Sequence, residues 1–129
     1  MKEITFENAQ KTQAHYSPAI LASDGGTVYV SGQLPIDPVT RNRCQEDIKK
    51  QTRIALENVE KIICQAGGTK ESILRTTAYI DEMENWDAVN EVYADFFGER
   101  KPARTIVCVN QIHFGLKVEI DAVAEVKAK

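Results

Sequence analysis

The sequence contains few of the residues from which disulfides and metal centres are built. Its three cysteines, Cys44, Cys64 and Cys108, are widely spaced with no CxxC pair, and it has only two histidines, His15 and His113. An odd number of isolated cysteines excludes a disulfide framework, and so few ligands exclude a zinc or histidine-rich centre. We therefore expect a protein of the reducing cytoplasm that binds no metal.

Long apolar runs and an excess of positive charge are also missing. No stretch approaches the ~18–20 apolar residues of a membrane-spanning helix, and residues 1–8 lack the apolar core of a secretory signal. Sixteen lysines and arginines against 19 aspartates and glutamates give a net charge of -3, whereas a nucleic-acid-binding protein usually carries a basic excess. We expect no membrane partner, and the charge balance disfavours nucleic acid.

Length and hydrophobic periodicity predict the fold class. With 129 residues, 43% of them hydrophobic, the chain fits a single domain over residues 1–129. The expected order is strand–strand–helix–strand–helix–strand–strand, an α+β fold with two helices packed on one face of a sheet. Gly67-Gly68 should end the first helix, and Asn85 should cap the second. Four of these five strands are predicted at residues 26–34, 74–80, 104–110 and 116–126, and the two helices at residues 46–66 and 85–97.

The last predicted strand alternates strictly between two kinds of residue. Leu116, Val118 and the next three even-numbered residues share an apolar face, whereas Lys117, Glu119 and Asp121 lie on a face that is mostly polar. The helices should cover the apolar face. The polar face must therefore meet water, a ligand or another subunit.

Two charged residues are candidates for chemistry. Arg104 follows Pro102 at the start of an otherwise apolar strand, and a rigidly presented guanidinium matches the two oxygens of a carboxylate. The alternative is an arginine in solvent or in a structural ion pair. Glu119, if partly buried, would have a raised pKa and could move protons or hold a water molecule. Its alternative is an exposed acid paired with Lys117 or Lys127.

The other candidates are ambiguous when judged singly. A tyrosine such as Tyr16 can orient a ligand, and Ser31-Gly32 would let a ligand approach the backbone. Cys64 is expected in the core beside the first helix, and Cys108 has no obvious base, since His113 follows five residues later. No GxGxxG, P-loop, HExxH or GxSxG motif is present.

Several short segments occur in a characteristic order and spacing. Over nearly the whole chain they make it similar to the RidA (YjgF/YER057c/UK114) family. The segments are Tyr29-Val30-Ser31-Gly32-Gln33-Leu34-Pro35, residues 51–68, residues 89–97, Pro102-Ala103-Arg104 and residues 118–124.

The resemblance implies a fold, an assembly and an activity. The fold would be chorismate-mutase-like, and the assembly a homotrimer with a central barrel and ligand clefts between subunits. The activity would be hydrolysis of the reactive 2-enamines and 2-imines that pyridoxal-phosphate enzymes release, such as 2-aminoacrylate and 2-iminobutyrate, to 2-keto acids and ammonia. No cofactor would be involved.

The resemblance also assigns roles to residues. Arg104 would clamp the substrate carboxylate, and Glu119 would hold and activate the attacking water. Tyr16, Ser31, Gly32 and Asn90 would border the ligand.

The sequence departs from the family pattern at three places. Ile106 stands where the family commonly has a cysteine and would line the substrate pocket. His15 alters the segment before Tyr16. Ile112-His113 replaces a Leu-Pro pair, in what we expect to be a hairpin that lines the cleft. Substrate preference is the property that these departures affect most.

Two other functions stay open on sequence grounds. The same trimer clefts could serve a non-catalytic, regulatory protein that binds small carboxylates. RNA cleavage, which some relatives are reported to show, is disfavoured by the acidic composition and by the lack of a histidine pair.

Overall fold

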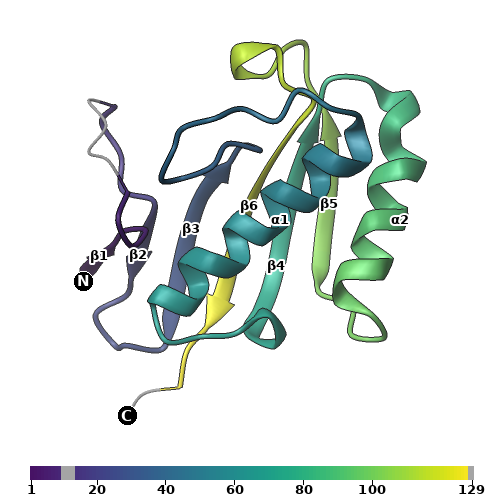
Figure 1. Ribbon diagram of the computed structural model, residues 1–129. Helices are drawn as coiled ribbons and strands as arrows, with labels where there is room; N and C mark the ends of the chain where they lie inside the picture. Colours follow the sequence, from purple (N-terminus) through teal and green to yellow (C-terminus); the bar gives the residue numbers. More distant parts are fainter. Residues whose placement is uncertain (10–13, 128–129) are drawn as a thin grey trace.

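The computed structural model describes residues 1–9 and 14–127 (Figure 1). The long helices begin and end close to the predicted positions. The elements are, in order, β1 Lys2–Ile4, β2 Ala19–Leu21, β3 Thr27–Gln33, α1 Ile48–Gln65, η1 Lys70–Ser72, β4 Ile73–Ile80, η2 Met83–Asn85, α2 Trp86–Phe97, β5 Ala103–Cys108, η3 His113–Gly115 and β6 Val118–Glu125.

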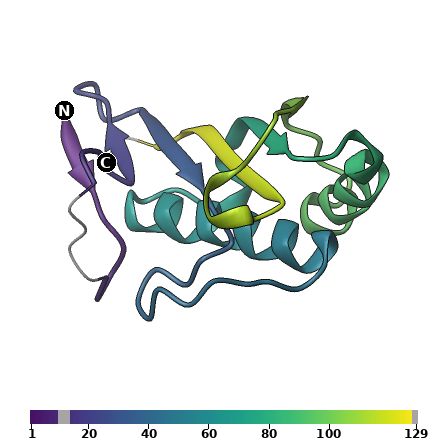
Figure 2. The ribbon, with the colours of Figure 1, turned by 90° about the horizontal axis from the view of Figure 1, so that it is seen from above.

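The six strands within residues 1–9 and 14–127 form one mixed sheet in the order β1-β2-β3-β6-β4-β5. Only β4 and β5 are parallel, and the other neighbours are antiparallel. Viewed from above, both helices lie on the same face of the sheet, and no described element covers the other face (Figure 2). The predicted α+β class with two helices on one face is confirmed.

Two details of the predicted topology are wrong. Three strands, rather than two, precede the first helix, because β1 and β2 have only three residues each and show no periodicity. The expected hairpin between the last two strands does not form, because β4 lies between β5 and β6. The β4–α2–β5 segment is a parallel crossover, so the chain after β5 must pass the end of β4 to reach its place beside β3.

Helix α1 begins and ends through local signals in the sequence. The Asp47 side chain accepts a hydrogen bond from the Lys50 backbone N–H at 2.9 Å, and Gly67 adopts a φ of 94°, which favours glycine. Between them the helix buries residues at steps of three and four. The predicted core position of Cys64 is wrong. Cys64 lies beside this buried face and is exposed.

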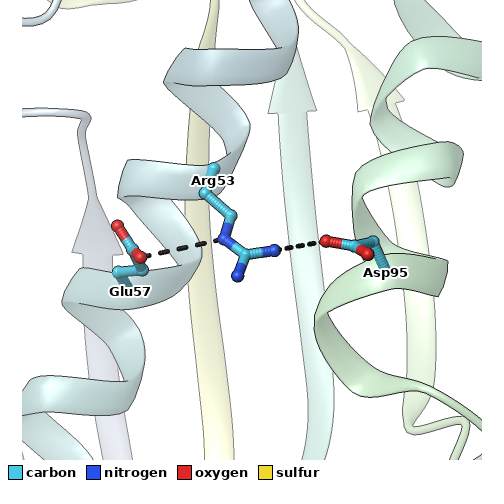
Figure 3. Close-up of polar contacts among 3 residues, drawn as sticks. All are labelled: Arg53, Glu57 and Asp95. Carbon is cyan, nitrogen blue, oxygen red and sulfur yellow. Dashed lines mark hydrogen bonds and ion pairs between the residues drawn. The ribbon is translucent and has the colours of Figure 1, made fainter.

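Helix α2 begins in a different way from that predicted. Asn85 does occupy the N-cap position, but it ends a 3-10 turn with helical backbone angles, and its side chain makes no capping hydrogen bond. Gly98, with a φ of 68°, ends the helix as expected. Arg53 of α1 joins the two helices, because its Nη1 lies 2.6 Å from Asp95 Oδ2 (Figure 3).

Strand β6 alternates as the sequence predicted. Val118, Ile120 and Ala124 are fully buried beneath the helices, whereas Glu119 and Asp121 point to the uncovered side of the sheet and remain partly exposed. We call this side the open face. No helix among residues 1–9 and 14–127 is long and apolar enough to span a membrane.

Candidate functional site

Glu119 lies on the open face directly against Gly32 of the neighbouring strand. The pairing of β3 with β6 is irregular between Val30 and Gln33, and Gly32 lies in that irregular stretch. A Cβ atom on residue 32 would be 2.9 Å from Glu119 Cδ and 3.0 Å from its Oε2. The absence of a side chain at Gly32 therefore leaves the space that the Glu119 carboxylate occupies.

The surroundings of Glu119 favour its neutral form. Burial raises the pKa of this carboxyl group, the negative charge of Asp121 raises it further, and His113 lowers it in part. Among the described residues the Glu119 side chain has no hydrogen bond or ion pair, which excludes the expected alternative of pairing with Lys117 or Lys127. A half-buried, unpaired carboxyl group of this kind is suited to proton transfer.

Two further predicted residues, Tyr16 and Ser31, lie near Gly32. Tyr16 and Gly32 both line a small cavity of about 80 Å³, and Tyr16 is 54% exposed. Ser31 is adjacent, but its hydroxyl donates to the Ser17 carbonyl at 2.6 Å. The Ser31 hydroxyl therefore holds the segment that carries Tyr16 and retains only acceptor capacity for a ligand.

Arg104 is held by one stripe of α2. Trp86, Asn90 and Tyr93 are spaced i, i+4 and i+7 and so share a helix face. The Arg104 guanidinium carbon lies 5.4 Å from the Trp86 ring centroid and 4.9 Å from that of Tyr93. Its Nη1 donates to Asn90 Oδ1 at 3.0 Å. Both rings attract the cation, and the other guanidinium N–H groups make no hydrogen bond to residues 1–9 or 14–127.

The Tyr93 side chain is held in place by a residue of β4. Its hydroxyl lies 2.8 Å from Thr76 Oγ1 in a buried hydrogen bond, and Thr76 is the β4 residue directly opposite Arg104. Burial raises the pKa of Tyr93 to about 12, so the hydroxyl stays protonated at neutral pH. Arg104 therefore rests on a rigid aromatic support. This support was not predicted, although the i, i+4, i+7 spacing of Trp86, Asn90 and Tyr93 is visible in the sequence.

The structure does not bring Arg104 and Glu119 together within one chain. Arg104 pairs with Thr76 and faces α2, whereas Glu119 pairs with Tyr79, whose hydroxyl bonds Asp121 on the open face. Paired residues of neighbouring strands share a face. The two predicted catalytic residues therefore lie on opposite faces of the sheet and on strands separated by β4.

The positions at which the sequence departs from the family lie in different places. Ile106 is partly buried, is packed against the main core and lies on the same face as Arg104. His113 is exposed in η3, and its ring lies 3.7 Å from that of Phe114. Phe114 adopts a φ of 62°, which is rare for an aromatic residue and was not foreseen. Arg43 lies 3.6 Å above the Phe114 ring.

No group of three or more metal-ligating side chains occurs within the part of the chain that the structure describes. The ionisable groups are instead distributed between the two faces of the sheet. These features describe a small α+β protein in which one mixed sheet carries two helices on one face, with Arg104 on the helix side and Glu119 on the open face.

Comparisons with known proteins identify relatives of this chain. The family model described as Endoribonuclease L-PSP matches residues 6–126. A RutC family protein of Pyrococcus horikoshii is 43% identical over 125 residues, covering 96% of this chain and 98% of that protein. YyfA of Yersinia pestis, described as a conserved Rid family protein, is 41% identical with a TM-score of 0.88, over 97% of this chain and 98% of that one.

Two structures from Escherichia coli are also similar. TdcF, solved with bound serine, is 32% identical with a TM-score of 0.87, over 99% of this chain and all of that one. The YjgF gene product is 32% identical with a TM-score of 0.88, over 98% of this chain and all of that one. The chain therefore belongs to the RidA/YjgF/L-PSP (RutC) family.

Proposed function

We propose that the protein hydrolyses 2-enamines and 2-imines, such as 2-aminoacrylate and 2-iminobutyrate, to 2-keto acids and ammonia. The observation that carries the proposal is the Glu119 carboxylate, which lies over Gly32 with a raised pKa and no partner among the described side chains. A carboxyl group in this state can hold a water molecule and take a proton from it. Membership of the family supports the same reaction.

Arg104 would bind the substrate carboxylate through the N–H groups that Asn90 leaves free. The oxygen of the water held by Glu119 forms a bond to the imine carbon, and the electron pair of the C=N bond moves to nitrogen. Glu119 accepts a proton from the water and passes it to that nitrogen. The new hydroxyl then loses its proton to Glu119, which passes it to the amine nitrogen, and the C–N bond breaks to leave a 2-keto acid and ammonia.

The reaction needs more than one copy of the chain, because Arg104 and Glu119 lie on opposite faces of the sheet. We expect a homotrimer in which the open face of one subunit brings Glu119, Tyr16 and Ser31 to the Arg104 side of the next. Exposed apolar side chains support burial of this face on assembly, since Tyr29 is 54% exposed and Val107 is 38% exposed.

A coupled assay tests the proposal. Threonine dehydratase supplies 2-iminobutyrate, and release of the keto acid is measured with and without this protein. We expect acceleration that Arg104→Ala abolishes. Arg104→Lys should retain only a small part of it, because lysine keeps the charge but loses the planar fork. If Arg104→Ala left turnover unchanged, the proposed binding of the substrate carboxylate by Arg104 would be wrong.

A second candidate function is binding of small carboxylates without turnover. The structure of TdcF with bound serine favours it, because that relative holds an amino acid. Saturable binding of a 2-keto acid by this protein, with no acceleration of imine hydrolysis, would support this function instead of the deaminase.

A further inference from the structure

The cavity beside Arg104 is lined by three positively charged residues and by no acidic one. It lies between the end of α2 and the start of β5, and its volume is about 470 Å³. The three cations are Arg100, Lys101 and Arg104, and Ala94 and Phe97 contribute an apolar wall. In a chain with 19 acidic residues and a net charge of -3, three cations gathered without an acid form a local positive site.

None of these cations is neutralised by a carboxylate among the described residues. Arg104 donates to the Asn90 amide oxygen. Arg100 donates through Nη2 to the Ile73 carbonyl, and its Nη1 is buried without a partner. Three like charges around one cavity repel one another. An anionic ligand would relieve this repulsion.

The helix dipole offers a simpler reason for two of the three charges. Arg100 and Lys101 follow the C-terminal end of α2, where cations are favoured. That reason does not involve Arg104. The dipole explanation and the ligand explanation also predict different results for Lys101. If Lys101 only balances the helix dipole, it affects stability and does not influence which ligand binds.

We propose that this cavity selects 2-imino and 2-keto acids that carry a second carboxylate. The proposal rests on the proposed deaminase function. Arg104 binds the carboxylate next to the reacting carbon, and Lys101 binds the distal one, with Arg100 adding positive charge to the cavity wall. Phe97 and Ala94 contact the methylene groups between the two carboxylates. A cavity of this volume lies within the usual range for small-ligand sites.

Calorimetric titration of the intact protein with 2-oxoglutarate and with 2-oxobutyrate tests the proposal. Both keto acids are stable product analogues, and they differ in the distal carboxylate. We expect 2-oxoglutarate to bind about tenfold more tightly, as one added charge-assisted hydrogen-bonded contact allows. Lys101→Gln should remove most of this difference and leave the affinity for 2-oxobutyrate unchanged.

Two controls separate the possible outcomes. Lys50→Gln makes the same charge change on an exposed lysine of α1, so it should leave the preference intact. Equal affinity for the two keto acids, with Arg104→Ala weakening both, would overturn the inference and leave the proposed function standing. A preference that persists in Lys101→Gln would also overturn it. Failure of both keto acids to bind would count against both proposals.

Discussion

Gly32 shows how a missing side chain can position a functional group on a neighbouring strand. Gly32 does not need a left-handed backbone, because its φ is not among the positive values. What matters is the contact that a Cβ would make with Glu119 at 2.9 Å. Gly32 is therefore important for steric reasons. Substitution by alanine, which adds a single methyl group, is sufficient to test this role.

We expect Gly32→Ala to lower the rate of imine hydrolysis at least about tenfold, because the Glu119 carboxylate must move to accommodate the methyl group. The free energy of unfolding should fall by only about 1 kcal/mol, since the displaced group is the end of a side chain at a half-exposed position. Kinetics and urea denaturation measure the two effects. Gly26→Ala is the matched control, because its nearest neighbour would lie at 3.5 Å. Equal rates in the two variants would contradict the steric role of residue 32.

The raised pKa of Glu119 predicts how activity depends on pH. The proposed base must be ionised, so the rate should fall as the pH drops through the raised pKa of Glu119, above the ordinary value of 4.5. A profile of the wild-type rate between pH 4 and 8 measures this. If the activity of the wild-type protein were lost only below the ordinary value, Glu119 would not be the titrating base.

The same shift has the opposite sign for stability. Because burial favours the neutral form, ionising Glu119 costs folded-state free energy once the pH exceeds the ordinary carboxyl pKa. Glu119→Gln should therefore unfold at a higher temperature than the wild-type protein at neutral pH. The difference should disappear at pH values below the ordinary pKa, where both side chains are neutral.

At the scale of elements, α2 does more than cover the sheet. One stripe of it supports Arg104, and a neighbouring stripe connects to α1. Arg53 of α1 contacts Asp95 of α2 at 2.6 Å and Glu57 of its own helix at 3.7 Å (Figure 3), and its guanidinium carbon lies 5.5 Å from the Phe96 ring centroid. The helix that carries the arginine support is thus linked to the rest of the helical layer.

We expect this link to contribute little free energy. The Arg53 side chain is 42% exposed and that of Asp95 is 77% exposed, so solvent screens their attraction. A double-mutant cycle with Arg53→Ala and Asp95→Ala should give a coupling of about 0.2–1 kcal/mol that decreases in high salt. Urea denaturation of the four proteins measures it. A coupling above that range would show that the ion pair is more shielded than its exposure indicates.

At the scale of the whole molecule, the placement of Arg104 and Glu119 on opposite faces gives a direct test of assembly. Arg104→Ala and Glu119→Gln should each be inactive alone. Mixing them in equal amounts by joint refolding should restore about a quarter of the wild-type activity, because one in four intersubunit sites then receives both intact residues. If mass spectrometry of the intact assemblies shows mixed oligomers and no activity returns, the shared site is contradicted.

Local signals in the sequence were sufficient for most of the secondary structure. The apolar steps of α1, the glycines that end both helices and the alternation of β6 each depend on neighbours within a few residues. Short β1 and β2 escaped prediction because their stability comes from pairing rather than from pattern. Cys64 was misplaced because it lies one position beside the buried stripe, a difference that periodicity does not resolve.

The fold class, the family resemblance and the candidate roles of Arg104 and Glu119 could be predicted before the structure, because they depend on local pattern and residue chemistry. The face of the sheet that each group occupies depends instead on how distant segments pair and pack. Insertion of β6 between β3 and β4 places Glu119 against Gly32 on the open face. The crossover through α2 places Arg104 at the opposite edge, among aromatic rings. Strand order arises from contacts between distant segments, which the sequence pattern does not encode.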